Sequence, residues 1–131
     1  MKPPLIIDTS ALRDAGFWKW LRNYHGRKVL PAVAYAELSV YLVNIKHRTQ
    51  DQVDELLGSM DMEIGWYRAD EARRTVEIAG MTRDFTEKAR DHMIASHAFL
   101  PPWVVVTYNI KDFKFLNDRA MTPPDAQIRF G

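Results

Sequence analysis

The feature that most constrains the fold is the alternation of short apolar runs with longer segments of helical periodicity. Apolar runs that suit strands occur at residues 4–8, 28–33, 62–67, 103–107 and, more weakly, 126–130. Helical spacing is found between them, at residues 33–47, 50–58, 69–80 and 84–100. Such alternation is typical of parallel sheets built from strand–helix–strand units. We therefore predict an α/β fold, a three-layer α/β/α sandwich with a mainly parallel central sheet.

The composition narrows the class of protein. A chain of 131 residues is long enough for one domain with a hydrophobic core that needs no disulfide or metal to hold it. It has no cysteine, which excludes disulfides, a thiolate nucleophile and zinc bound by cysteine, and we expect a cytoplasmic protein. No apolar run is long enough for a signal peptide or a membrane span. The net charge of +1 neither favours nor excludes nucleic acid.

The first apolar run stops abruptly on a carboxylate. In the stretch "PPLIIDTSAL", Asp8 follows the apolar residues directly, and two hydroxyl residues, Thr9 and Ser10, come next. Any of the three could cap the following helix by accepting a hydrogen bond from its first turn. Alternatively, Asp8 could belong to a ligand site, because ligands of open α/β sheets bind beyond the carboxyl ends of the strands. These ten residues alone leave both interpretations open.

Three more acids can reach the same edge of the predicted sheet. The strand at 103–107 runs into "YNIKDF", which carries Asn109 and Asp112. Glu37 lies in the first turns of the helix after the second strand, and Asp91 precedes the apolar half of its helix. Taken singly, each acid also has an ordinary structural explanation as a surface charge or a helix cap. Convergence of all four would be harder to explain without a ligand.

Four converging carboxylates would require a cation, because their charges repel one another and resist ionisation when no cation is present. Oxygen ligands select hard ions such as Mg²⁺ or Mn²⁺. Ions of this kind can activate a water molecule and stabilise the leaving oxygen of a phosphodiester. The acidic constellation therefore indicates metal-dependent hydrolysis.

Four segments, "LIIDTSAL", "PAVAYAELSVYL", "RDHMIASHAF" and "VVVTYNIKDF", carry a resemblance to a known family. In this order the chain resembles the PIN-domain family, particularly the VapC-type ribonuclease toxins of prokaryotic toxin–antitoxin pairs. The resemblance extends from residue 5 to about residue 115. It implies that residues 1–131 form a single PIN-like nuclease domain. It also implies a hydrolase, an endoribonuclease that depends on Mg²⁺ or Mn²⁺ and cleaves RNA phosphodiester bonds.

The resemblance also assigns roles position by position. The acids that bind the metal and support catalysis in the family correspond here to Asp8, Glu37, Asp91 and Asp112. Supporting positions correspond to Ser10, Thr107 and Asn109. The implied partners are an RNA substrate, a cognate antitoxin and a second copy of the chain, with no membrane involved.

Other functions remain open at this stage. The chain could be a PIN-fold RNA-processing nuclease outside any toxin–antitoxin system, or a PIN-fold binding protein without activity. A phosphatase of the haloacid-dehalogenase type would also place an aspartate after the first strand. It would need a second aspartate two residues later, where this chain has Ser10. Cleavage of RNA would separate the first possibility from the others.

The segment that follows Ser10 mixes aromatic residues with cations. Its basic residues, together with the first residue of the next apolar run, are Arg13, Lys19, Arg22, Arg27 and Lys28, and its aromatic residues are Phe17, Trp18, Trp20 and Tyr24. Aromatic rings among cations suit RNA, by stacking and phosphate contact, and in the family this region contributes to partner surfaces. Core packing explains one or two of these aromatic residues, so an interface and the core remain equally open for this segment. His97 presents a similar choice between a core histidine and a substrate contact.

Overall fold

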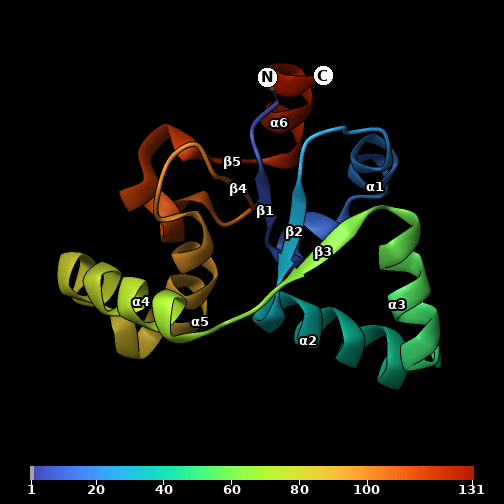
Figure 1. Cartoon of the computed structure of the whole chain (residues 1–131), viewed down its shortest axis with the longest axis horizontal. Coiled ribbons are helices and arrows are strands. Elements are labelled where there is room, and N and C mark those ends of the chain that lie inside the picture. Colours follow the sequence, from blue (N-terminus) through green and yellow to red (C-terminus); the bar gives the residue numbers. More distant parts are fainter. Residues whose placement is uncertain (1) are drawn as a thin grey trace.

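The computed structural model describes residues 2–131. A five-stranded sheet in the order β3–β2–β1–β4–β5 forms its centre, and every neighbouring pair is parallel (Figure 1). The strands are β1 (Leu5–Ile7), β2 (Lys28–Pro31), β3 (Met62–Gly65), β4 (Val104–Val106) and β5 (Ala120–Met121). The prediction of a parallel central sheet is confirmed.

Helices cover the sheet on both faces. They are α1 (Ala15–Arg22), α2 (Ala32–Val40), α3 (Gln50–Ser59), α4 (Ala69–Thr82), α5 (Phe85–Ala95) and α6 (Pro123–Phe130). Figure 1 shows α4 and α5 on one side of the sheet and α1 and α3 on the other, which confirms the three-layer arrangement. The 3-10 helices are η1 (Thr9–Arg13), η3 (Ser96–Ala98) and η4 (Ile110–Arg119), and η2 (Tyr41–Ile45) extends α2 as a π-helix. In residues 2–131, no helix combines the length and apolarity that crossing a membrane requires.

The two central strands explain why the sheet forms. All residues of β1 and β4 are buried, as expected for strands covered by helices on both faces. Ile6 lies between Val29 of β2 and Val105 of β4 in the parallel register. Branched side chains of this type pack well on a pleated surface that is shielded from water. The register brings the carboxyl ends of β1 and β4 side by side.

The predicted strand at 126–130 is wrong. Those residues belong to α6, and the fifth strand is the short β5 that precedes it. The side chain of Thr122 accepts a hydrogen bond from the backbone N–H of Asp125, and Pro123 occupies the first helical position. Both features favour the start of a helix. Helix α1, which lies within the aromatic and basic segment, was likewise not predicted as an element.

Candidate active site

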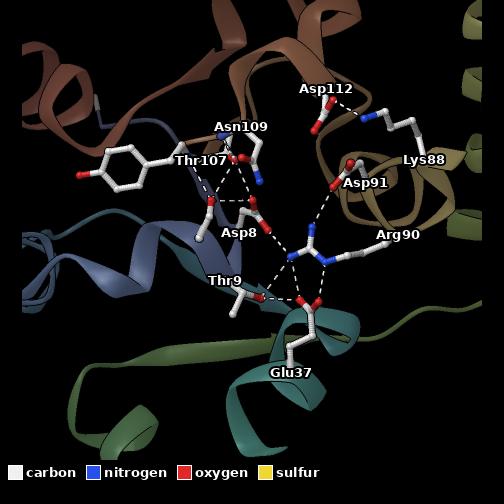
Figure 2. A network of polar contacts seen from close by, with 11 residues as sticks. Asp8, Thr9, Glu37, Lys88, Arg90, Asp91, Thr107, Asn109 and Asp112 are labelled. Carbon is white, nitrogen blue, oxygen red and sulfur yellow. Dashed lines mark hydrogen bonds and ion pairs between the residues drawn. The ribbon is translucent and has the colours of Figure 1, made fainter. Parts of the chain in front are cut away.

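The candidate site lies at the carboxyl edge of the sheet (Figure 2). Asp8 directly follows β1, and Thr107 directly follows β4. Glu37 comes from α2 and Asp91 from α5, while Asp112 lies in η4. Side chains from five separate elements therefore lie in one region. The parallel strands β1 and β4 both end at this edge of the sheet, and α2, α5 and η4 each place one acid beside it.

Asp8 is fully buried, and hydrogen bonds satisfy both of its oxygens. Its Oδ2 accepts hydrogen bonds from Ser10 Oγ at 2.8 Å and from Thr107 Oγ1 at 2.7 Å. Its Oδ1 accepts one from Arg90 Nη2 at 2.6 Å. The predicted supporting positions Ser10 and Thr107 thus both contact Asp8. A carboxylate without exposure to water keeps its charge only with such partners.

The capping interpretation of this stretch is wrong. The side chain of Asp8 makes no capping hydrogen bond to η1, and the hydroxyl of Ser10 is used by Asp8. Thr9 Oγ1 donates to Glu37 Oε1 at 2.7 Å. The cap of the next α-helix is Asp14, whose Oδ1 accepts a hydrogen bond from the N–H of Phe17 at 3.1 Å. The polar side chains after β1 are therefore committed to the site.

Arg90 stands at the centre of the acids. Its Nε and Nη2 donate to the two oxygens of Glu37 at 2.6 and 2.7 Å, in a bidentate pair. Its Nη1 donates to Asp91 Oδ1 at 2.8 Å, and Nη2 also donates to Asp8. Figure 2 shows this single guanidinium reaching three carboxylates from three different elements. Bidentate charge-assisted bonds of this kind are stronger and more directional than neutral ones.

The fourth acid has its own cation. Lys88 Nζ donates to Asp112 Oδ1 at 2.8 Å, and Lys88, like Arg90, belongs to α5. Asn109, the remaining supporting position, donates its backbone N–H to Thr107 Oγ1 at 2.9 Å. Each of the four predicted acids is therefore paired with a positive side chain of α5.

Burial and these partners shift the pKa values in opposite directions. Burial alone would raise the pKa of Glu37, but the hydrogen bonds from Arg90 and Thr9 outweigh it, so the pKa is lowered. The pKa of Asp91 is raised, mainly by burial, with Asp112 and Asp8 adding to the effect against the charge of Arg90. The pKa of Arg90 is raised, because its bonds with Glu37 and Asp8 outweigh its burial. Repulsion among the acids is thus still present at Asp91.

The side chains of the site carry oxygen atoms of the kind that bind a divalent ion. The predicted ligands are all carboxylates, with hydroxyl and amide oxygens beside them, which is the donor chemistry that Mg²⁺ and Mn²⁺ select. In residues 2–131, however, no three acidic or histidine side chains are grouped as the ligands of one ion. The guanidinium of Arg90 lies between three of the acids in the place of a cation. The oxygen atoms are therefore of the types that bind Mg²⁺ or Mn²⁺, but in this structure the carboxylates are arranged around the guanidinium of Arg90.

A groove of about 1030 Å³ opens beside the acids. Glu37, Arg90, Asp91 and Asn109 line one part of it. The other part is apolar and aromatic, lined by Leu12, Trp18, Leu38, Tyr41, Leu42 and Leu56. The acids therefore border a space large enough for part of a polymer rather than facing a closed cavity.

The basic and aromatic segment divides between surface and core. Phe17 and Tyr24 are buried in the core, and Trp18 and Trp20 pack against it. The exposed cations are Arg13, Lys19, Arg22 and Arg27. Lys28 was predicted with them, but it is buried, and its Nζ donates to the carbonyl of Leu21 at 3.1 Å, so it is not available to RNA or a partner. Of these four exposed cations, Arg13 lines the groove beside the acids.

His97 does not line the groove beside the acids. It is partly buried and lines a different cavity of about 420 Å³, against Val29 and Gly65, which shares no lining residue with the groove. Burial lowers its pKa. The interpretation of His97 as a packed histidine fits this position better than a contact with substrate at the acids.

Three residues of the site were not predicted: Thr9, Lys88 and Arg90. The sequence contains a signal for Arg90, since it directly precedes the predicted acid Asp91 in "RDHM". Side chains of adjacent helical residues point in different directions. The adjacency in sequence therefore does not indicate that Arg90 forms hydrogen bonds with both Asp91 and Glu37. The contacts depend on the position of α5 relative to α2.

The sheet order and the layers agree with the PIN-like fold that the resemblance in the sequence implies. Neither a protein-family model nor a curated protein matches the chain. Among solved structures, a chain of VapBC-1 from nontypeable Haemophilus influenzae is similar, with a TM-score of 0.62 over 90% of this chain and 96% of that chain. The identity between the two is 17%, so the similarity concerns the fold. The fold predicted from the sequence, that of VapC-type PIN domains, is confirmed.

Proposed function

We propose that this chain is a metal-dependent endoribonuclease that hydrolyses RNA phosphodiester bonds, the toxin of a type II toxin–antitoxin pair. The observation that carries the proposal is the meeting of Asp8, Glu37 and Asp91 at the carboxyl edge of a PIN-like sheet, with Asp112 beside them. The open groove next to these acids supports a polymeric substrate. The proposal places this activity in the cytoplasm, in one PIN-like nuclease domain.

In this proposal Asp8, Glu37, Asp91 and Asp112 hold Mg²⁺ or Mn²⁺. The metal would activate a water molecule and neutralise charge on the phosphate. Ser10 and Thr107 orient Asp8 through their hydrogen bonds to Oδ2, and Asn109 lies at the groove beside them. Arg13, exposed on the wall of the groove, is placed to contact an RNA phosphate. Lys19, Arg22 and Arg27 are exposed cations that could contact RNA or a partner farther from the acids.

Cleavage of RNA is the direct test. Purified protein, stripped with a chelator and reloaded with Mn²⁺, should cleave labelled structured RNAs, and Asp8→Asn should reduce the rate by at least about a hundredfold, the contribution of a well-placed charged group. Asp51→Asn, an exposed aspartate on α3, is the matched control and should cleave like the wild type. Circular dichroism of each variant separates loss of activity from loss of folding.

Several results would contradict the proposal. Metal-loaded wild-type protein that cleaves no RNA pool above the background of Asp8→Asn would exclude a nuclease and favour a PIN-fold binding protein. Cleavage by both proteins at one rate would indicate a contaminant. Cleavage in the absence of any antitoxin gene beside the coding sequence would favour an RNA-processing nuclease over a toxin.

We also propose a cognate antitoxin and a homodimer as partners. Exposed apolar side chains lie next to the groove on the end of α2 and on η2, namely Val40, Tyr41 and Ile45. A patch of this kind beside an apolar groove suits a partner segment or a second copy. Sedimentation should find the chain as a dimer or with a co-expressed neighbouring gene product. A strict monomer at high concentration, alone after co-expression, would contradict this part of the proposal.

A further inference from the structure

The side chain of Arg90 uses the same carboxylate oxygens that a metal ion would need. It donates to both oxygens of Glu37, to Oδ1 of Asp8 and to Oδ1 of Asp91. The second oxygen of Asp8 already accepts from Ser10 and Thr107. Each oxygen of Asp8 and Glu37 is therefore engaged while Arg90 is in place.

A divalent ion and the guanidinium cannot share this position. An ion bound by Asp8 and Glu37 would lie where the nitrogen atoms of Arg90 lie now, since both must be within bonding distance of the same oxygens. Two positive groups a few ångströms apart in a half-buried site also repel each other strongly. Occupation by one cation therefore disfavours occupation by the other.

Arg90 has room to leave. About a third of its side chain is exposed (32%), and it lines the groove next to the acids. A rotation about its side-chain bonds would carry the guanidinium into the groove while the backbone of α5 stays in place. Its departure without a replacement cation would leave Asp8, Glu37 and Asp91 to repel one another.

We propose that Arg90 is an internal counter-ion that closes the acidic site in the absence of metal and competes with the divalent ion for it. The metal-free protein is thus held in an inactive but stable state, and metal binding requires Arg90 to swing into the groove. This inference rests on the proposed function, because it assumes that these acids take a metal. The competition itself is a property of the contacts and can be measured without any activity.

Calorimetric titration with Mn²⁺ tests the competition. In chelator-stripped protein, Arg90→Gln should bind Mn²⁺ more tightly than the wild type by about tenfold or more, a usual size for coupling between two sites. Its thermal midpoint without metal should be lower than that of the wild type, and Mn²⁺ should raise this midpoint by more. Arg90→Lys, which keeps the charge with fewer donors, should lie between the two.

Arg13→Gln is the matched control. It removes one positive charge from the wall of the same groove, and Arg13 contributes to the field at Glu37 without a hydrogen bond to it. Its affinity for Mn²⁺ should stay close to that of the wild type. Equal gains in Arg13→Gln and Arg90→Gln would mean that net charge alone sets the affinity, and this would overturn the proposal.

A measurement on the unaltered chain covers the case in which Arg90→Gln does not fold. The Nε–H proton of Arg90, bonded to Glu37, should give a protected nuclear magnetic resonance signal, assigned by its absence in Arg90→Lys. Titration with Mg²⁺ should abolish this signal. Persistence of the signal at saturating Mg²⁺ would overturn the proposal, as would weaker or equal Mn²⁺ binding by Arg90→Gln. Failure of both proteins to bind Mn²⁺ would instead contradict the metal-dependent function itself.

Discussion

At the scale of residues, the site is a balance of buried opposite charges. Asp8 is not exposed to water, and instead it forms an ion pair with Arg90 and accepts hydrogen bonds from the hydroxyls of Ser10 and Thr107. Pairs of this kind are costly to bury, yet the loss of one partner leaves the other charge uncompensated. Arg90 is the common partner of Asp8, Glu37 and Asp91, so one side chain determines the state of three acids.

Two of these acids should respond to pH with opposite sign. The lowered pKa of Glu37 adds stability that is present above its ordinary pKa of 4.5 and is lost as the pH falls through the folded value. The raised pKa of Asp91 subtracts stability as the pH rises above 3.8 through the folded value. In chelator, Glu37→Gln should therefore lose less stability than the wild type as the pH falls below 4.5, and Asp91→Asn should lose more.

Urea unfolding at a series of pH values measures this difference. Asp70→Asn, an exposed aspartate of α4, serves as the control and should parallel the wild type because its ion pair with Arg73 is a surface pair within one helix. Parallel curves for Glu37→Gln and Asp91→Asn would show that the network of Arg90 does not distinguish the two acids.

At the scale of elements, α5 supplies the cations of the site. Lys88 and Arg90 lie two residues apart and pair with acids of η4 and of α2, respectively. Side chains two residues apart on a regular helix do not face the same way, but the backbone at Lys88 departs from helical geometry, with a φ of −123°, and both cations reach the acids. A regular helix alone would not place both cations over this edge of the sheet.

A second link between elements joins α1 to the loop after β4. Asp14 caps α1 by accepting a hydrogen bond from the N–H of Phe17, and its Oδ2 accepts another from Tyr108 Oη at 2.7 Å. We expect Asp14→Ala to lower the free energy of unfolding by about 1 kcal/mol, the usual cost of a lost cap.

Tyr108→Phe separates the two functions of Asp14, since it removes the hydroxyl and leaves the cap. Its loss in urea unfolding should be smaller than that of Asp14→Ala, because this hydrogen bond is exposed. A larger loss for Tyr108→Phe would show that the tie to the loop, rather than the cap, is the main contribution of Asp14.

At the scale of the whole molecule, stability comes from the centre of the sheet. Ile6 is buried between two strands, whereas Ile128 on α6 is 83% exposed. Replacement by alanine removes the same atoms at both positions. We expect Ile6→Ala to cost about 2–5 kcal/mol and Ile128→Ala no more than about 0.5 kcal/mol in urea unfolding. Similar costs would mean that α6 is covered by a partner in solution.

The sequence by itself determined the first four strands, the helical segments between residues 33 and 100, and the edge of the sheet at which the acids were expected. Branched apolar runs predict buried strands, and the parallel connection places their carboxyl ends at one edge, so Asp8 and Asp112 could be expected together. The short β5 and helix α6 were not predicted correctly, because a two-residue strand carries no periodicity and the signal of Thr122 and Pro123 was outweighed by an apolar pattern.

Only the tertiary structure decided which charges meet. Arg90 is 53 residues from Glu37 and 82 from Asp8 along the chain, and their contacts depend on how α5 packs near α2 and the end of β1. The burial of Lys28 is likewise a result of packing, since one of its sequence neighbours, Arg27, is exposed and the other, Val29, is buried. Local sequence patterns indicate whether a residue faces the core or the solvent. Which charges meet in a site depends on several elements that are distant in sequence and come together only when the chain folds.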